Sequence, residues 1–235
     1  MLDLVDISVI VAIEIVHKGV RTMSNMLRVS ESNLVRSLVT ILRDERTQGA
    51  EFRDTIDRVT TLLLADVLAY VPVQQTTVRT PLGVLADGHK LHPDHMVGLV
   101  TIFRAGLAMM PAASRFLPVS PVFHLGLARD ENTAEAQWYY KKLPDGKKHK
   151  WVLLLDPMLA TGGSAISAIK ALKNWGAEKI TLIGIIGAKA GVEAVHFLYP
   201  DVDIYLAALD EKLDERKYIV PGLGDAGDRI FGTNY

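Results

Sequence analysis

The sequence predicts an α/β fold, in which helices cover both faces of a mostly parallel sheet. Short apolar runs alternate with amphipathic segments from Val97 to Ala208, which is the order of repeated strand–helix–strand units. The run Val97–Phe103 is apolar at nearly every position, as expected for a strand buried on both faces of a parallel sheet. The 235 residues are 49% hydrophobic and 23% charged, which is ordinary for a globular chain and excludes a disordered one.

Two helices are expected before this alternating region. Ser30–Leu42 begins with capping-type residues and carries leucines at helical spacing, and Glu51–Tyr70 has one apolar face. An edge strand is expected at Thr76–Thr80 and a polar loop at His89–His95. The apolar run Ile7–Val16 fits a strand or a short helix, and periodicity does not separate the two.

The later elements follow from apolar runs and from the residues that end helices. Pro111 interrupts one helix and Gly176 ends another. The strands expected here are Val97–Phe103, Val122–Ala128, Trp138–Lys142, Trp151–Leu155, Ile180–Ile186 and Ile204–Ala208, and the helices are Ala105–Phe116, Ser164–Trp175 and Val192–Leu198. The simplest organisation is one domain with helices at its N-terminal end and a glycine-rich lobe at its C-terminal end.

Charge and cysteine content exclude several classes of function. Lys and Arg number 26 and Asp and Glu 27, so a net charge of -1 supplies no overall basic field for nucleic acid. The absence of cysteine excludes disulfides, thiolate zinc sites and a cysteine nucleophile, and fits a reducing cytoplasm. Apolar stretches are too short for a transmembrane helix, and the N-terminal residues lack the features of a signal peptide.

The segment Trp151–Ser167 has the pattern of a phosphate site. A buried strand ends at Asp156, and Thr161, two glycines and Ser164 follow before a helix begins. Paired glycines let main-chain N–H groups converge on a phosphate, and the helix N-terminus adds positive potential. The alternative is a glycine turn in which Ser164 is an ordinary helix cap.

Two further segments carry possible ligand contacts. Arg104 stands where a buried strand ends, and its guanidinium would suit a diphosphate; taken alone, a capping or ion-paired arginine is the favoured interpretation. The segment Tyr218–Thr233 holds four glycines around Asp225 and Asp228, which suggests main chain approaching a flat ligand. The alternative for this segment is a mobile tail.

In this order the three segments resemble the uracil phosphoribosyltransferase family of type I phosphoribosyltransferases. DPMLATGGS (156–164) is similar to the family's loop for phosphoribosyl pyrophosphate (PRPP), and RAGL (104–107) to its pyrophosphate loop. YIVPGLGDAGDRIFGT (218–233) is similar to its uracil-recognition hood. ARDENT (128–133), YYKKLP (139–144) and PDVDIYLAALDEKLDE (200–215) also match.

The resemblance implies conversion of uracil and PRPP into UMP and pyrophosphate in pyrimidine salvage. It implies PRPP contacts from Arg104, from Arg129 in an arm that closes over PRPP, and from the loop at residues 156–164. The full set expected to bind PRPP is Arg104, Arg129, Asp156, Pro157, Met158, Leu159, Ala160, Thr161, Gly162, Gly163, Ser164 and Asp225. Uracil contacts are expected from Ile219, Gly224, Asp225 and Ala226, and roles in catalysis from Arg104 and Asp225.

The resemblance also bears on cofactor, partners and organisation. Mg²⁺ is the implied cofactor, held mainly through PRPP and water because Pro157, and not a second acid, follows Asp156. A homodimer or homotetramer is implied, with GTP or a pyrimidine nucleotide as a possible effector whose site the sequence does not locate. Residues 1–30 are expected to form an N-terminal extension and 31–235 the phosphoribosyltransferase domain, with the hood within 210–235.

Departures and alternatives accompany this interpretation. The family usually has leucine where Phe103 stands and glycine where Ala108 stands, and both changes are expected to spare activity. The histidines of Asp87–His95 are poorly spaced for a metal and favour a solvated loop, and the aromatic residues 138–140 favour an arm or a dimer contact. The other functions considered are a PRPP-binding regulatory protein that binds RNA and a phosphoribosyltransferase for another base.

Overall fold

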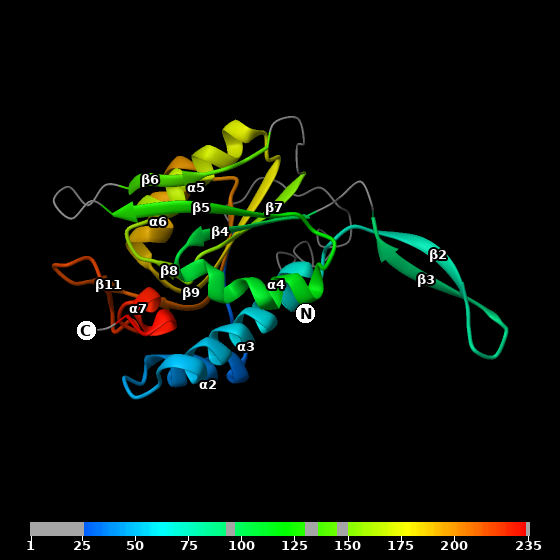
Figure 1. Cartoon of the computed structure of the whole chain (residues 1–235), viewed down its shortest axis with the longest axis horizontal. Helices are drawn as coiled ribbons and strands as arrows, with labels where there is room; N and C mark the ends of the chain where they lie inside the picture. The colour runs from blue at the N-terminus through cyan, green and yellow to red at the C-terminus, as the bar shows by residue number, and fades with distance from the viewer. Residues whose placement is uncertain (1–25, 93–96, 130–135, 145–149, 234–235) are drawn as a thin grey trace, which may run out of the picture.

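A computed structural model describes residues 26–92, 97–129, 136–144 and 150–233. Its main sheet has the strand order β1-β10-β9-β7-β4-β5-β6, and β8 pairs with β9 (Figure 1). Every pair is parallel except β5 with β6. The strands are β1 (Leu27–Val29), β4 (Val97–Phe103), β5 (Val122–Arg129), β6 (Ala136–Lys141), β7 (Trp151–Leu155), β8 (Met158–Leu159), β9 (Lys179–Ala188) and β10 (Asp203–Asp210).

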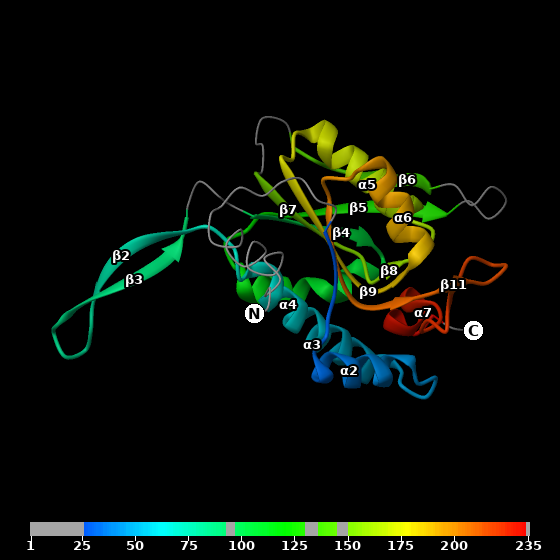
Figure 2. The ribbon, with the colours of Figure 1, turned by 180° about the vertical axis from the view of Figure 1, so that it is seen from behind.

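Helices cover both faces of this sheet, which confirms the predicted fold class. On one face lie α2 (Asn33–Arg43), α3 (Gly49–Leu68), the 3-10 helix η3 (Ala105–Met109), α4 (Met110–Phe116) and α7 (Ala226–Phe231). On the other lie α5 (Gly163–Trp175) and α6 (Lys189–Leu198), as Figures 1 and 2 show. Leu153 and Leu154 are both fully buried but belong to the cores on opposite faces. This alternation explains why β7 is apolar throughout.

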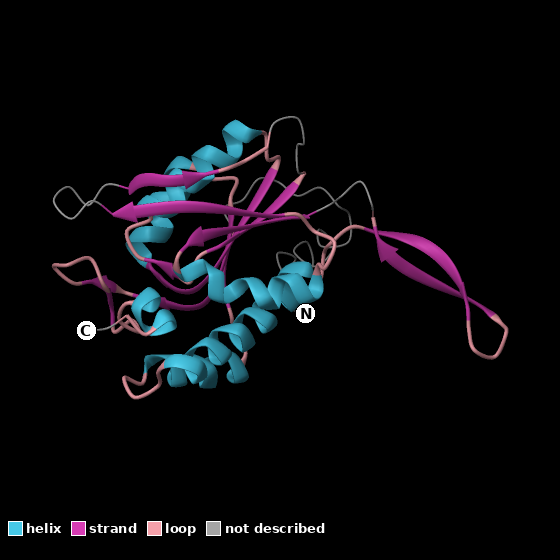
Figure 3. Cartoon of the chain, in the orientation of Figure 1, coloured by secondary structure: helices cyan, strands magenta, loops and turns pink. Residues whose placement is uncertain are grey.

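A two-stranded hairpin extends from the body of the molecule (Figure 3). It consists of β2 (Val73–Arg79) and β3 (Leu85–Leu91), paired antiparallel. The Gly83 N–H donates to the Thr80 carbonyl at 2.9 Å and closes the turn. The predicted loop is therefore wrong at residues 89–91, which lie in β3. Solvent surrounds both faces of the hairpin, so β3 lacks the apolar alternation that identifies a half-buried strand.

The N-terminal end of the described chain contributes to the main sheet. Leu27–Val29, within the stretch assigned from sequence to an extension, forms the edge strand β1 and pairs in parallel with β10. Three residues are too few to show strand periodicity, which explains why the pattern missed them. The run Ile7–Val16 lies outside the described residues. Within the described ranges no helix has the length and apolarity to span a membrane.

The C-terminal lobe is folded against the N-terminal helices and is not a loose tail. β11 (Lys212–Leu213) and β12 (Ile219–Val220) form a short antiparallel hairpin, and α7 follows. Leu223, Ala226 and Ile230 are buried in the same core as α2 and α3. We call residues 210–233 the hood.

Candidate functional site

The carboxyl ends of the parallel strands place the three sequence segments at one edge of the sheet. Asp156 follows β7, Arg104 follows the neighbouring β4, and β10 leads into the hood. This edge is where ligands bind in open α/β sheets. The chain therefore brings residues that are more than a hundred positions apart to one end of the molecule.

The loop after β7 encloses a small hollow at the start of α5. The hollow has a volume of about 50 Å³ and is lined by Asp156, Met158, Leu159, Ala160, Thr161, Gly162, Ser164 and Ala165. Gly162 has a φ of 86° and a Cβ there would lie 3.0 Å from the Gly191 carbonyl oxygen, so glycine suits this position. Gly163 is exposed and begins the helix, whose N-terminal N–H groups favour an anion.

Asp156 is electrostatically unusual. Burial raises the pKa of its carboxyl to about 7, and a hydrogen bond with the Met158 main chain acts in the opposite direction. The same residue lies at the end of β7 and lines the hollow. A carboxyl with a pKa near neutrality in a ligand site can change protonation when a ligand binds.

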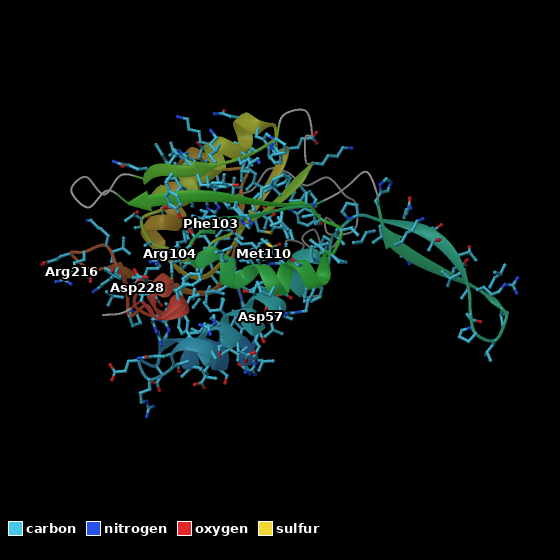
Figure 4. All side chains as sticks on the ribbon, in the orientation of Figure 1. Asp57, Phe103, Arg104, Met110, Arg216 and Asp228 are labelled. Carbon is cyan, nitrogen blue, oxygen red and sulfur yellow. The ribbon has the colours of Figure 1, made fainter. Side chains whose placement is uncertain are left out.

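Arg104 connects the strand edge with the hood. Its Nη2 donates to Asp228 Oδ1 at 3.2 Å, and its guanidinium lies 5.9 Å from the centre of the Phe231 ring. Figure 4 shows Arg104 and Asp228 side by side. The Arg104 side chain remains 55% exposed, so its guanidinium is available to an anionic ligand.

Gly106 allows the Arg104 loop to pack directly on the end of β7. A Cβ at this position would lie 2.5 Å from the Leu155 carbonyl oxygen and 3.3 Å from the Thr101 Cβ. The first of these atoms is main chain and cannot rotate away. The pyrophosphate-type loop therefore touches the end of β7, directly before the phosphate-type loop, through a glycine.

We expect Gly106→Ala to lower the free energy of unfolding by about 1–3 kcal/mol, since the added methyl must displace η3 from β7. Denaturant unfolding would measure the change. Gly88→Ala is the control, because its Cβ would meet only the Thr76 methyl at 3.9 Å in the exposed hairpin. Equal stability of the two variants would contradict the steric argument.

The hood presents main chain and one acidic cap. Ile219 and Ala226 are buried, and Gly224 has a φ of 77°, a conformation that favours glycine. Asp225 caps α7, with its Oδ1 accepting from the Asp228 N–H at 2.9 Å. Main-chain groups at residues 219 and 224–226 are therefore held in a defined arrangement at the site.

Phe103, where the family usually has leucine, is accommodated by other aromatic rings. Its ring stacks on His124 at 4.7 Å between centroids and on Tyr140 of β6 at 5.9 Å. Thr101 Oγ1 lies 2.7 Å from His124 Nδ1, which fixes the imidazole. These contacts pack Phe103 beside Arg104 but leave the Arg104 side chain exposed.

The predictions for Arg129 and for the cation stay predictions. Arg129 is the last residue of β5, at the same sheet edge, but its side chain and residues 130–135 lie outside the description. Its predicted closure over a ligand is untested. Among the described residues no three His, Asp or Glu side chains gather as a metal site. A cation at this edge would thus depend on ligand oxygens and water beside acids such as Asp156 and Asp225.

Sequence reasoning missed the buried charges that hold the hood. Arg229 and Asp210 are only 8% and 7% exposed, and both bond to hood main chain. Arg43 and Arg53 reach the hood from α2 and α3. Arg229 belongs to the matched C-terminal motif, but nothing in that motif indicates that its side chain bonds to main-chain carbonyls of the N-terminal helical region.

Comparison with known proteins identifies the family. The model of the family described as uracil phosphoribosyltransferase matches residues 29–233. The uracil phosphoribosyltransferase of Halalkalibacterium halodurans is 48% identical over 200 residues, covering 85% of this chain and 95% of that protein. That of Dictyoglomus turgidum is 47% identical over 208 residues, covering 88% and 100%.

Solved structures agree with the fold. The AQ2163 protein from Aquifex aeolicus aligns with a TM-score of 0.81 and 31% identity, covering 89% of this chain and 99% of that one. The adenine phosphoribosyl transferase from Trypanosoma brucei aligns with a TM-score of 0.52 and 13% identity over 88% of this chain and 90% of its own, a likeness of fold alone.

Proposed function

The chain belongs to the uracil phosphoribosyltransferase family and is a pentosyltransferase of pyrimidine salvage, and we propose that the edge formed by residues 104, 156–164 and 219–226 is its active site. The observation that carries this proposal is the contact of Arg104 with Asp228, which joins two of the three family motifs across 124 residues of sequence. The substrates are uracil and PRPP, and the products are UMP and pyrophosphate. This family membership favours uracil phosphoribosyltransferase activity over the two alternatives, a PRPP-binding regulatory protein and a phosphoribosyltransferase for another base.

PRPP is assigned to the loop after β7 and to Arg104. The N–H groups and hydroxyls of Thr161–Ser164 suit the 5-phosphate at the start of α5, and the Asp156 carboxylate suits the ribose hydroxyls. Pro157–Ala160 shape the loop between them. Arg104 is assigned to the diphosphate, and Arg129 at the end of β5 to an arm that closes over PRPP.

Uracil is assigned to the hood. Its ring edge alternates carbonyl and N–H groups, which main-chain groups of Ile219, Gly224 and Ala226 can match. Cytosine carries an amino group where uracil has a carbonyl, so it would leave hood groups mispaired. A site built on hydrogen bonds rejects such an analogue strongly. Asp225 is assigned a role toward both substrates.

In the reaction, N1 of uracil attacks the anomeric carbon of PRPP and the bond to pyrophosphate breaks. The geometry suits this displacement, because Arg104 offers a cation to the charge that develops on the leaving group. Asp156 and the hood hold the two reacting partners in place. Mg²⁺, when bound with PRPP, would add neutralisation of the diphosphate charge, and Asp225 and Asp156 are acids of the proposed site beside which it would lie.

The proposal extends to assembly and organisation. The β2–β3 hairpin exposes Leu82, Val84 and Leu85, with Leu82 89% exposed, and this apolar surface supports a homodimer or homotetramer. GTP or a pyrimidine nucleotide remains a proposed effector with no assigned site. Residues 31–235 form the catalytic domain in this proposal. Strand β1, which precedes them, extends the main sheet by pairing with β10.

Titration of uracil into the enzyme loaded with PRPP and Mg²⁺ tests the site. We expect Asp225→Asn to weaken uracil binding roughly 10- to 100-fold, the effect of losing a charge-assisted hydrogen bond. Asparagine still caps a helix, so α7 should persist. Glu215→Ala, an exposed acid of the hood hairpin, is the matched control. Unchanged uracil binding in Asp225→Asn would reject this placement of the base.

A further inference from the structure

The main chain of the hood is held by buried and half-buried charged side chains to which the proposed reaction assigns no role. We propose that Arg229 and the Arg43–Asp210 pair are positioning residues that set the affinity and selectivity for uracil without touching the base. The inference rests on the proposed uracil site at Ile219 and residues 224–226. It assigns to the N-terminal helices a role in base recognition.

Arg229 ties the hood to the connection between α2 and α3. Its Nη1 donates to the Leu223 carbonyl at 2.7 Å and to the Leu42 carbonyl, and its Nη2 to the Asp44 and Thr47 carbonyls at 2.6 and 2.7 Å. Leu223 directly precedes Gly224 of the proposed uracil site. One guanidinium thus joins one hood carbonyl to three carbonyls of the N-terminal helical region.

The guanidinium of Arg229 is also locked from one side by an aromatic ring. It lies 4.2 Å from the centre of the Phe52 ring, and Phe52 is fully buried on α3. A planar fork with four acceptors and a stacking partner has one orientation available to it. Lysine at this position keeps the charge but has neither the fork nor the stacking plane.

The Arg43–Asp210 pair holds Gly222 in a similar way. Arg43 Nη1 donates to the Gly222 carbonyl at 2.8 Å, and the Gly222 N–H donates to Asp210 Oδ2 at 2.9 Å. Arg43 and Asp210 bind each other through two hydrogen bonds of 2.8 and 2.6 Å. Both polar main-chain groups of Gly222 are therefore fixed by side chains from α2 and β10.

Gly222 in turn touches the proposed uracil residue Ile219. Gly222 has a φ of 58°, and a Cβ on it would lie 2.0 Å from the Ile219 carbonyl oxygen. A glycine-rich segment has few side-chain contacts of its own to define its path. Where main-chain groups read a base, a displacement near 1 Å can cost about 10²-fold in rate. The hydrogen bonds from Arg229 and Arg43 therefore fix the main-chain path of this glycine-rich segment.

The PRPP loop shares none of these contacts. It is built on β7, β8 and α5, whereas Arg229 and Arg43 bond to the hood, to Asp210 and to the α2–α3 connection. In the described part of the chain only Arg104 and Asp225 link the hood to the PRPP site, so a positioning role predicts a larger effect on uracil than on PRPP. A purely structural role predicts that stability falls while the remaining folded enzyme keeps its affinity for both substrates.

The test compares Arg229→Lys and Arg43→Lys with Arg46→Lys. Arg46 lies in the same α2–α3 connection but is 86% exposed and pairs with the Asp44 carboxylate. We would measure KM for uracil, Kd for PRPP with Mg²⁺, the ratio of kcat/KM for uracil to that for cytosine, and Tm. Each assay is run at a temperature well below the Tm of the variant.

We expect each of the two hood variants to raise KM for uracil at least tenfold and to lower the uracil-to-cytosine ratio, while Kd for PRPP changes less than KM for uracil. Arg46→Lys should match wild type. If Arg229→Lys does not fold, Arg43→Lys, whose side chain is 26% exposed, decides the question. An unchanged KM for uracil, or equal losses for uracil and PRPP, would overturn the inference.

The Asp225→Asn variant in the same series separates this inference from the site assignment. Weaker uracil binding in Asp225→Asn together with a normal KM in both lysine variants rejects the positioning role and retains the site. Normal uracil binding in Asp225→Asn rejects the site itself, and with it the premise of the inference.

Discussion

Replacing Arg104 with alanine should lower kcat/KM for PRPP by about 10²–10³-fold, the cost of removing one preorganised donor to a developing negative charge. Arg104 stands at the end of β4 with its side chain 55% exposed and a 3.2 Å bond to Asp228. Pyrophosphate leaves with charge that this guanidinium can stabilise in the transition state. Steady-state rates of pyrophosphate release would measure the loss.

The fold should survive this substitution. An exposed ion pair contributes about 0–1 kcal/mol to stability, so the Tm of Arg104→Ala should stay close to that of wild type. Arg104→Lys should keep more activity than Arg104→Ala, because lysine retains the positive charge. It should remain below wild type, because an ammonium lacks the bidentate fork of a guanidinium. Arg115→Ala, which removes an arginine bound to Asp57 on the helical face, serves as the control. A decrease of less than threefold in kcat/KM for PRPP in Arg104→Ala would show that Arg104 has no role in the reaction.

The affinity for PRPP should rise with pH until about pH 7 through the titration of Asp156. Its pKa in the free enzyme is raised to about 7 by burial, so the carboxyl is protonated below that pH. Ribose hydroxyls donate to a carboxylate more strongly than to a neutral acid. Binding therefore releases a proton, and Kd should fall up to about tenfold per pH unit below pH 7 and level off above it.

Calorimetric titration in buffers of different ionisation enthalpy would count the released proton. The 5-phosphate of the ligand titrates near pH 6 as well. Asp156→Asn isolates the contribution of the protein, since it cannot titrate but keeps the shape of the side chain. The same pH dependence in Asp156→Asn would show that the proton comes from the ligand alone.

The pH dependence of protein stability tests the direction of the Asp156 pKa shift independently. The unfolded chain loses the Asp156 proton near its ordinary pKa of 3.8, and the folded chain only near 7. In the absence of ligand, this group therefore lowers stability progressively as the pH rises between these values, and fully above them. The free energy of unfolding of Asp156→Asn minus that of wild type should therefore be larger at pH 8 than at pH 4.

Local patterns were sufficient for the body of the fold. The bounds predicted for β4 and β7 agree with the structure, because strands buried on both faces are apolar throughout. Gly176 was expected to end α5, and it does so with a φ of 98°. The motif segments that carry the family resemblance are also local, and the family model matches residues 29–233. Fold class and family follow from such short-range features.

Other features depend on contacts between distant residues. The hairpin strand β3 has no buried face, and β1 is defined by its pairing with β10 about 177 positions later, so neither leaves a clear local period. The raised pKa of Asp156 arises from the burial created by the surrounding elements.

The positions of Arg104 and Arg229 show most clearly what depends on tertiary contacts. In the chain, Arg104 and Arg229 are both arginines next to glycine-containing motifs. In the folded protein, Arg104 is exposed at the sheet edge, while the side chain of Arg229 is buried between the hood and the N-terminal helices with four carbonyl acceptors. Residue type and spacing identify the chemistry available to this chain. Which arginine stays exposed at the sheet edge and which one holds the hood depends on packing between segments up to 187 residues apart, and that packing has no local signature.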